Sequence, residues 1–95
     1  MEDYPTEEQL EKIRSWYSTE IEDFHKLMLH VCYLWHWQDM ATCENGVYTL
    51  ITGGWSGNEE IIRALRDNQL FWILYWYSSN RGGKHVFCKA GALLP

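Results

Sequence analysis

Apolar residues recur at helical spacing in the first part of the chain. Leu10, Ile13, Trp16 and Tyr17 fall on one face of a helix. Thr6 followed three residues later by Gln9 is a capping-box pattern, in which the side chain of each residue satisfies a backbone N–H of the other. The pattern predicts a short amphipathic helix that begins after Thr6.

A second and longer helix is predicted after residues 18–19, which read as a break with a new N-cap. Its apolar positions are Ile21, Phe24, Met28, Val31 and Trp35. We expect the helix to end near Trp35, with irregular structure after it and a loop over residues 40–46. Residues 34–39 also fit an extended segment with Trp35 and Trp37 on one side.

The middle of the chain reads as a strand, a glycine-rich loop and a helix. Residues 47–52 are rich in β-branched and aromatic side chains and follow the turn dipeptide Asn45-Gly46, which predicts a strand. Residues 53–57 contain three glycines, which favour positive φ or close backbone approach. Asn58 is the expected N-cap of the helix that follows. The apolar stripe of this helix is Ile61, Ile62 and Leu65.

Residues 70–77 are apolar or aromatic at every position. As a strand, this run presents apolar side chains to both faces of a sheet, which predicts a central strand. Periodicity alone does not separate a buried strand from a buried helix over so short a run, and a helix here would contradict the assignment. Residues 78–83 then predict a hairpin connection, and residues 84–88 an antiparallel return strand.

Ninety-five residues make one domain with a single modest core. We expect an α+β fold over residues 1–95, with a helical part at residues 1–46 and a strand–loop–helix–strand–hairpin part at residues 47–89. Two N-terminal helices and a third between strands would pack on a small antiparallel sheet around residues 70–77. One face of that strand would lack cover within a single subunit, so we also predict a homodimer or higher assembly.

The glycine-rich loop is the candidate binding site. Backbone amides at the start of a helix attract anions, and a tryptophan in the loop adds a flat surface for stacking. A second glycine turn brings in an arginine, whose planar fork suits phosphate or carboxylate. The candidate ligand-binding residues are Gly53, Gly54, Trp55, Ser56, Gly57, Asn58 and Arg81. The alternative interpretation is that both glycine segments only make turns, with Trp55 in the core and Arg81 in solvent.

The C-terminal half of the chain carries a distinctive set of motifs. They are Thr52-Gly53-Gly54-Trp55-Ser56-Gly57-Asn58-Glu59-Glu60-Ile61-Ile62, Phe71-Trp72, Trp76, Arg81-Gly82-Gly83 and Val86-Phe87. This set resembles a family of short proteins encoded by bacteriophages and prophages. The resemblance implies a setting, the cytoplasm of an infected bacterium, and a class, an accessory or host-modulating protein. It supplies no mechanism, so no functional residue follows from it.

Charge and composition narrow the possible partners. The net charge of −5 argues against non-specific binding to nucleic acid, which needs a basic surface. Eight of the thirteen acidic residues lie within residues 2–23, whereas the charged residues after position 80 are Arg81, Lys84 and Lys89. A small anionic ligand fits this local cationic pattern better than a duplex does. Six Trp and six Tyr exceed what a small core hides, so some should line a pocket or a subunit interface.

No catalytic or metal signature accompanies the loops. Cys32, Cys43 and Cys88 are an odd number at irregular spacing, and we interpret them as reduced thiols of a cytosolic protein without a metal site or cofactor. Around Ser56, glycine comes one position too early for the nucleophile elbow of a hydrolase. No apolar run approaches the roughly twenty residues that span a bilayer. We therefore expect a soluble, non-enzymatic protein with no membrane contact.

Two functions from different classes fit these observations. In the first, the protein holds a small anionic, nucleotide-like molecule between Trp55, the glycine amides and Arg81, and so depletes a signal of the host's defence. In the second, its aromatic or acidic surface blocks a host enzyme. The loops favour the first hypothesis, and the acidic N-terminal third favours the second.

Overall fold

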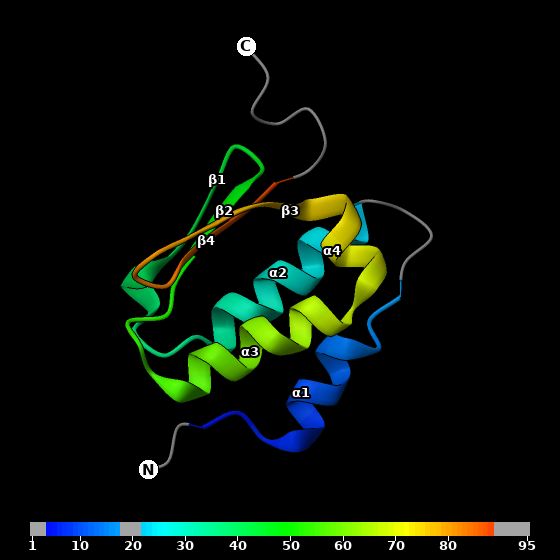
Figure 1. The fold of residues 1–95 in the computed structure, drawn as a ribbon. Coiled ribbons are helices and arrows are strands. Elements are labelled where there is room, and N and C mark those ends of the chain that lie inside the picture. Colours follow the sequence, from blue (N-terminus) through cyan, green and yellow to red (C-terminus); the bar gives the residue numbers. More distant parts are fainter. Residues whose placement is uncertain (1–3, 18–21, 89–95) are drawn as a thin grey trace.

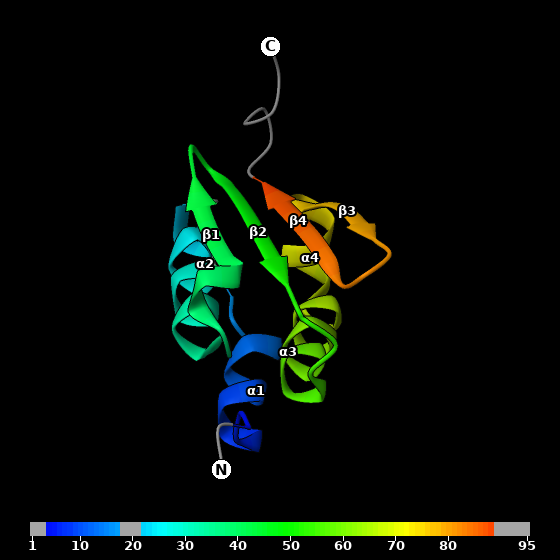
Figure 2. The same ribbon diagram turned by 90° about the vertical axis from the view of Figure 1, so that its left-hand side faces the viewer.

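The computed structural model describes residues 4–17 and 22–88, and these form an α+β fold in which helices pack on one face of an antiparallel sheet (Figures 1 and 2). The elements are α1 (Glu7–Arg14), α2 (Glu22–Leu34), the 3₁₀ turn η1 (Gln38–Met40), β1 (Ala41–Glu44), β2 (Val47–Ile51), α3 (Ser56–Asp67), α4 (Gln69–Tyr75), β3 (Trp76–Asn80) and β4 (Lys84–Cys88). Within the described residues, no helix is long and apolar enough to cross a membrane.

The first helix begins as the sequence predicts. The Gln9 N–H donates to Thr6 Oγ1 at 3.1 Å, and the Thr6 N–H donates to Gln9 Oε1 at 2.8 Å. This reciprocal capping box fixes the start of α1, whose buried side chains are Leu10 and Ile13. The helix ends at Arg14, however, so the predicted apolar face stops one turn earlier than expected and Trp16 lies beyond it.

The predicted second helix is present as α2. Phe24, Met28 and Val31 are buried, as their spacing predicts, and Trp35 is buried immediately after the helix ends. The predicted N-cap at residues 18–19 and the first apolar position, Ile21, lie outside the described residues.

The sheet has four strands in the order β1-β2-β4-β3, and all neighbours are antiparallel. The predicted loop over residues 40–46 is wrong, because β1 pairs with β2 from Ala41 opposite Leu50 to Glu44 opposite Val47. Asn45 and Gly46 have φ of 56° and 78° between these strands. Two successive positive φ values match the twist of a two-residue hairpin, which explains why β1 forms from a weakly apolar segment.

The prediction of a central strand at residues 70–77 is wrong. Gln69–Tyr75 is the helix α4, and the chain becomes extended only from Trp76 onward, as the edge strand β3. Asn68 begins α4 by accepting a hydrogen bond from the Phe71 N–H at 3.2 Å. Phe71 and Tyr75, four residues apart, are buried on one helical face, which is the spacing of a helix and not the alternation of a strand. The central strands are β2 and β4.

The core lies between the inner face of the sheet and the helices. Tyr48 of β2 and Phe87 of β4 are opposite each other in the sheet and are both buried. The ring of Phe24 on α2 packs edge-on against those of Phe71 and Tyr75 on α4, with ring centroids 5.6 Å apart in both pairs. The same two α4 rings contact the sheet, Phe71 against Phe87 and Tyr75 against Tyr48, so α4 packs on the sheet although its sequence pattern also suits a strand.

Candidate functional site

The two glycine turns predicted as a site meet in the structure. The Thr52 N–H donates to the Gly83 carbonyl at 3.0 Å, so the turn between β3 and β4 lies beside the loop between β2 and α3. A β-carbon at Gly83 would collide with Thr52 Oγ1, which means that only glycine permits this approach. Arg81 is exposed on the same turn. The arginine is therefore brought to the side of the sheet where the glycine loop begins.

Several polar groups of the loop are bonded within the chain. The Gly54 N–H donates to Thr52 Oγ1 at 3.2 Å, and the Trp55 N–H donates to the Thr52 carbonyl at 3.2 Å. The Thr52 hydroxyl in turn donates to Glu59 Oε2 at 2.8 Å. A carboxylate in the first turn already complements the positive end of α3. The loop therefore closes on itself around Thr52.

The prediction that Asn58 is the N-cap of the third helix is wrong. Helix α3 begins at Ser56, with Trp55 in the N-cap position, and Asn58 is fully buried in the first turn. Its Oδ1 accepts from the His36 N–H at 3.0 Å, and its Nδ2 donates to the carbonyls of His36 at 3.1 Å and Thr52 at 3.3 Å. Asn58 thus joins the segment after α2 to the glycine loop. Spacing along the sequence gives no sign of this distant partner.

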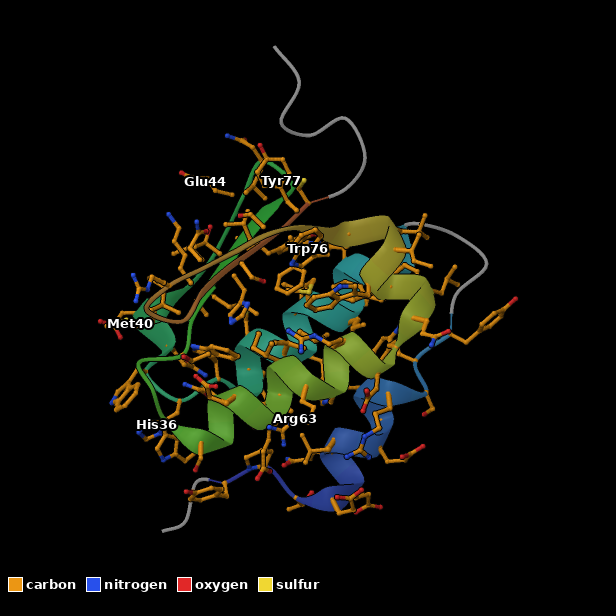
Figure 3. The ribbon with its side chains drawn as sticks, in the orientation of Figure 1. His36, Met40, Glu44, Arg63, Trp76 and Tyr77 are labelled. Carbon is orange, nitrogen blue, oxygen red and sulfur yellow. The ribbon has the colours of Figure 1, made fainter. Side chains whose placement is uncertain are left out.

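Four aromatic side chains form a continuous row over the loop. The His36 ring is 4.5 Å from the Trp37 ring and 4.4 Å from the Trp55 ring, and it stacks on Trp55 with an interplanar angle of 29°. Tyr4 continues the row with its ring 4.7 Å from that of Trp55, and its hydroxyl lies 2.6 Å from Ser56 Oγ. We call Tyr4, Trp55, His36 and Trp37 the aromatic row. Figure 3 shows His36 at the end of the molecule where α3 begins.

The loop glycines make room for this row. A β-carbon at Gly53 would stand 2.6 Å from Cζ3 of Trp37, and one at Gly57 would overlap the ring of Trp55. Gly53 also has a φ of 64°, which side chains rarely tolerate. The glycines predicted as ligand contacts therefore support two tryptophan rings. Trp55 is neither buried only among core residues nor open to solvent on all sides, because its ring packs between Tyr4 and His36 of the row.

Trp37 has an unusual backbone for so large a residue. Its φ and ψ are 64° and 74°, in the left-handed region, and it remains 45% exposed. A non-glycine residue in this region costs on the order of 1–3 kcal/mol, and such residues concentrate at binding and active sites. The Trp37 carbonyl accepts from the Met40 N–H at 2.8 Å, which holds the turn into η1. The strained conformation keeps a large apolar ring at the surface.

A pocket of about 470 Å³ opens on one side of the aromatic row. Its lining residues are Tyr4, Pro5, Thr6, Gln9, Tyr33, Leu34, Trp35, His36 and Trp37. Three of these belong to the aromatic row, while Trp55 stands behind His36 and Tyr4 rather than in the lining. Arg81 is also absent from this lining. The lining contains no Asp, Glu, Lys or Arg, so its polar groups are hydroxyls, the Gln9 amide and one imidazole beside the aromatic ring faces.

The site residues predicted from the sequence therefore do not line this pocket. Gly53 and Trp55 only contact aromatic rings that do. Tyr4, Tyr33, His36 and Trp37 line the pocket and were not proposed from the sequence. The run Trp35-His36-Trp37 was the available signal, because three aromatic rings at the end of an amphipathic helix exceed what packing of that helix requires. No sequence pattern indicated Tyr4, because its hydrogen-bond partner Ser56 lies 52 positions away along the chain.

Comparison with protein-family models, curated proteins and solved structures found no significant match to this chain.

In residues 4–17 and 22–88, no three His, Cys, Asp or Glu side chains come close enough together to hold a metal ion. Cys32, Cys43 and Cys88 are free thiols, and burial raises the pKa of each of them above its usual value. A raised pKa disfavours the thiolate, the reactive form of cysteine.

Proposed function

We propose that the protein is a non-enzymatic binding protein that holds one small, nucleotide-like ligand with a planar ring and an anionic group. The observation that carries this proposal is Trp37, a half-exposed tryptophan in a strained left-handed conformation at the rim of an aromatic pocket. Core packing alone would bury this ring completely, whereas a ring left exposed can stack on a planar ligand.

The pocket suits a flat heterocycle. Its volume of about 470 Å³ falls within the range of roughly 300–1,000 Å³ that is usual for small-molecule sites. Tyr33 and Trp37 supply exposed ring surface, and Tyr4 closes the side next to Trp55. A base that stacks on such rings gains on the order of 1–3 kcal/mol. An anionic group on the ligand would meet the imidazole of His36.

Arg81 would contact a different part of the ligand from the aromatic pocket. It stands exposed on the turn that contacts Thr52, outside the pocket lining, so it would hold only a ligand long enough to reach past the glycine loop. The resemblance to short phage-encoded proteins supports a setting in the host cytoplasm, where such a protein would withhold a nucleotide signal from host defence. Binding without turnover agrees with a pocket whose lining lacks carboxylates and thiols.

The test is a thermal-shift screen of nucleotides and cyclic nucleotides on the wild-type protein. A ligand at about a hundred times its dissociation constant stabilises the native state by roughly 2.7 kcal/mol. Since each kcal/mol moves the melting midpoint of so small a domain by about 4–8 °C, we expect a rise of about ten degrees or more. Mass spectrometry of material released on denaturation would identify a ligand that co-purifies.

Three variants locate the ligand. Trp37→Ala should abolish the shift, and Trp76→Ala is the matched control, because Trp76 is 43% exposed and lies outside the pocket lining. Arg81→Ala reports whether the ligand extends to the second glycine turn. The proposal fails if no planar anion shifts the wild-type midpoint, or if Trp37→Ala retains the full shift. Co-purification of a host protein in that case would favour the enzyme-blocking hypothesis.

A further inference from the structure

Helix α4 presents apolar side chains to solvent on the side away from the core. Phe71 and Tyr75 are buried, whereas Leu70, Ile73 and Leu74 are exposed. The three exposed residues are spaced by three and four positions, so they share one helical face. Ile73 is 77% exposed, which is unusual for a β-branched aliphatic residue in the middle of a helix.

The exposed apolar residues continue past the helix into β3. Trp76 is 43% and Tyr77 57% exposed, and Figure 3 shows both where α4 passes into β3. We call Leu70, Ile73, Leu74 and Trp76 the α4 surface; Tyr77 is the next residue of β3 and points to the opposite face of the sheet. Residues 68–80 contain no charged side chain. A surface that is apolar and uncharged in a protein this small marks an interaction site.

The α4 surface is large enough for a weak contact with an identical surface. If a large side chain has roughly 200 Å² of surface, the exposed fractions of these four residues leave on the order of 400 Å² of apolar area open on one protomer. Two protomers would bury on the order of 800 Å², which is in the range of weak, transient interfaces. The area therefore predicts a concentration-dependent dimer rather than a permanent one.

We propose that the α4 surface binds the α4 surface of a second copy of this chain in a twofold homodimer. Two copies each carry a net charge of −5, so they repel one another, and a contact through a surface without charged side chains adds no local repulsion to this. Residues 68–80 meet this requirement, because any contact between them is neutral. In a twofold dimer the same surface of each protomer contacts its own copy. An apolar, uncharged surface can do so without any matching of opposite charges.

The outer face of the sheet is the competing open surface. Figure 2 shows the sheet in front of the helices, with no helix on the side toward the viewer. Val47, Ile51 and Val86 on β2 and β4 are only partly exposed, however, and charged Glu44 and Lys84 stand opposite Val47 and Ile51 in the register. A self-contact of this face would have to accommodate these charged side chains, whereas residues 68–80 contain none.

The experiment is sedimentation velocity on the full chain, from micromolar to several hundred micromolar concentration. The wild type should pass from monomer to dimer over this range. Ile73→Glu should raise the dimer dissociation constant by roughly a hundredfold or more, because each copy would bury an unpaired carboxylate. Leu29→Glu is the matched control, since Leu29 is 49% exposed on α2 and lies outside the α4 surface. Its dimer should be unchanged.

Circular dichroism would establish that each variant is folded. If Ile73→Glu unfolds, Leu70→Glu provides the same test from the preceding turn of α4. A wild type that stays monomeric throughout the range overturns the proposal, even if another protein binds the α4 surface. A dimer that Leu29→Glu and Ile73→Glu weaken equally, or that Ile73→Glu leaves intact, also overturns it.

Discussion

The ring of Trp37 rests on the backbone of Gly53, so closely that a β-carbon at Gly53 would stand 2.6 Å from Trp37 Cζ3. Both residues have positive φ, 64° in each case. The two unusual conformations therefore depend on each other, because only a glycine leaves room for the ring and the ring covers the glycine.

Gly53→Ala should lower the free energy of unfolding by about 2–3 kcal/mol, from left-handed strain together with displacement of Trp37. Gly54→Ala is the matched control, because Gly54 has a φ of 79° but no atom within 4 Å of the added β-carbon. It should lose only about 1 kcal/mol. Urea unfolding measures both variants. Equal losses would mean that the contact between Trp37 and Gly53 contributes nothing.

Asn58→Ala should destabilise the protein by about 3 kcal/mol. The substitution removes three hydrogen bonds in a fully buried place and leaves the His36 N–H and two carbonyls without this partner. Asn80→Ala is the control at an exposed position and should change the free energy of unfolding by less than about 0.5 kcal/mol. The measurement is chemical denaturation; a small effect at Asn58 would show that the loop stands without it.

Two substitutions at Asn68 separate its two roles. Its Nδ2 donates to the carbonyls of Ile13 at 2.9 Å and Trp16 at 2.8 Å, which ties the end of α1 to the junction of α3 and α4. Its Oδ1 caps α4 through the Phe71 N–H. Asn68→Ser keeps a capping oxygen and loses the tie, whereas Asn68→Ala loses both. Alanine should therefore cost about 1 kcal/mol more than serine in thermal or urea unfolding. If both variants lose the same free energy of unfolding, the capping hydrogen bond to the Phe71 N–H contributes nothing to stability.

His30 should make stability depend on pH. Its Nε2 is buried without a hydrogen-bond partner among the described residues. Burial, and secondly the positive charge of Lys12, lowers the pKa of His30 below its usual 6.5. The unfolded chain therefore takes up a proton at higher pH than the folded one does. Neutral His30 therefore makes its full contribution to the free energy of unfolding above about pH 6.5. The protein loses this contribution as the pH falls toward the lowered pKa of His30 in the folded state.

His30→Leu should reduce the slope of unfolding free energy against pH between about pH 7 and pH 5. It should also keep or raise stability at neutral pH, because it removes an unpaired buried nitrogen. Burial also lowers the pKa of His85, so part of the slope should remain in this variant. Urea unfolding at several pH values measures the difference. An unchanged slope would show that His30 does not titrate with folding.

The sequence by itself determined the features that neighbouring residues control. Thr6 and Gln9 are three positions apart, so their capping box and the start of α1 follow from local geometry. The 3.6-residue spacing of Phe24, Met28 and Val31 determined α2, and the glycines at positions 53 and 54 predicted backbone with positive φ. The α+β class followed from these elements.

Tertiary contacts decided the rest. Residues 70–77 fit a strand or a helix, and α4 forms because Asn68 caps it while Phe71 and Tyr75 pack on Phe24. Asn58 reads as a helix cap, but its partner His36 lies 22 positions away. The pocket likewise joins Tyr4 and Thr6 to residues 33–37. Local pattern fixes hydrogen bonds within one turn of chain, whereas contacts between distant segments depend on packing energy that no single stretch contains.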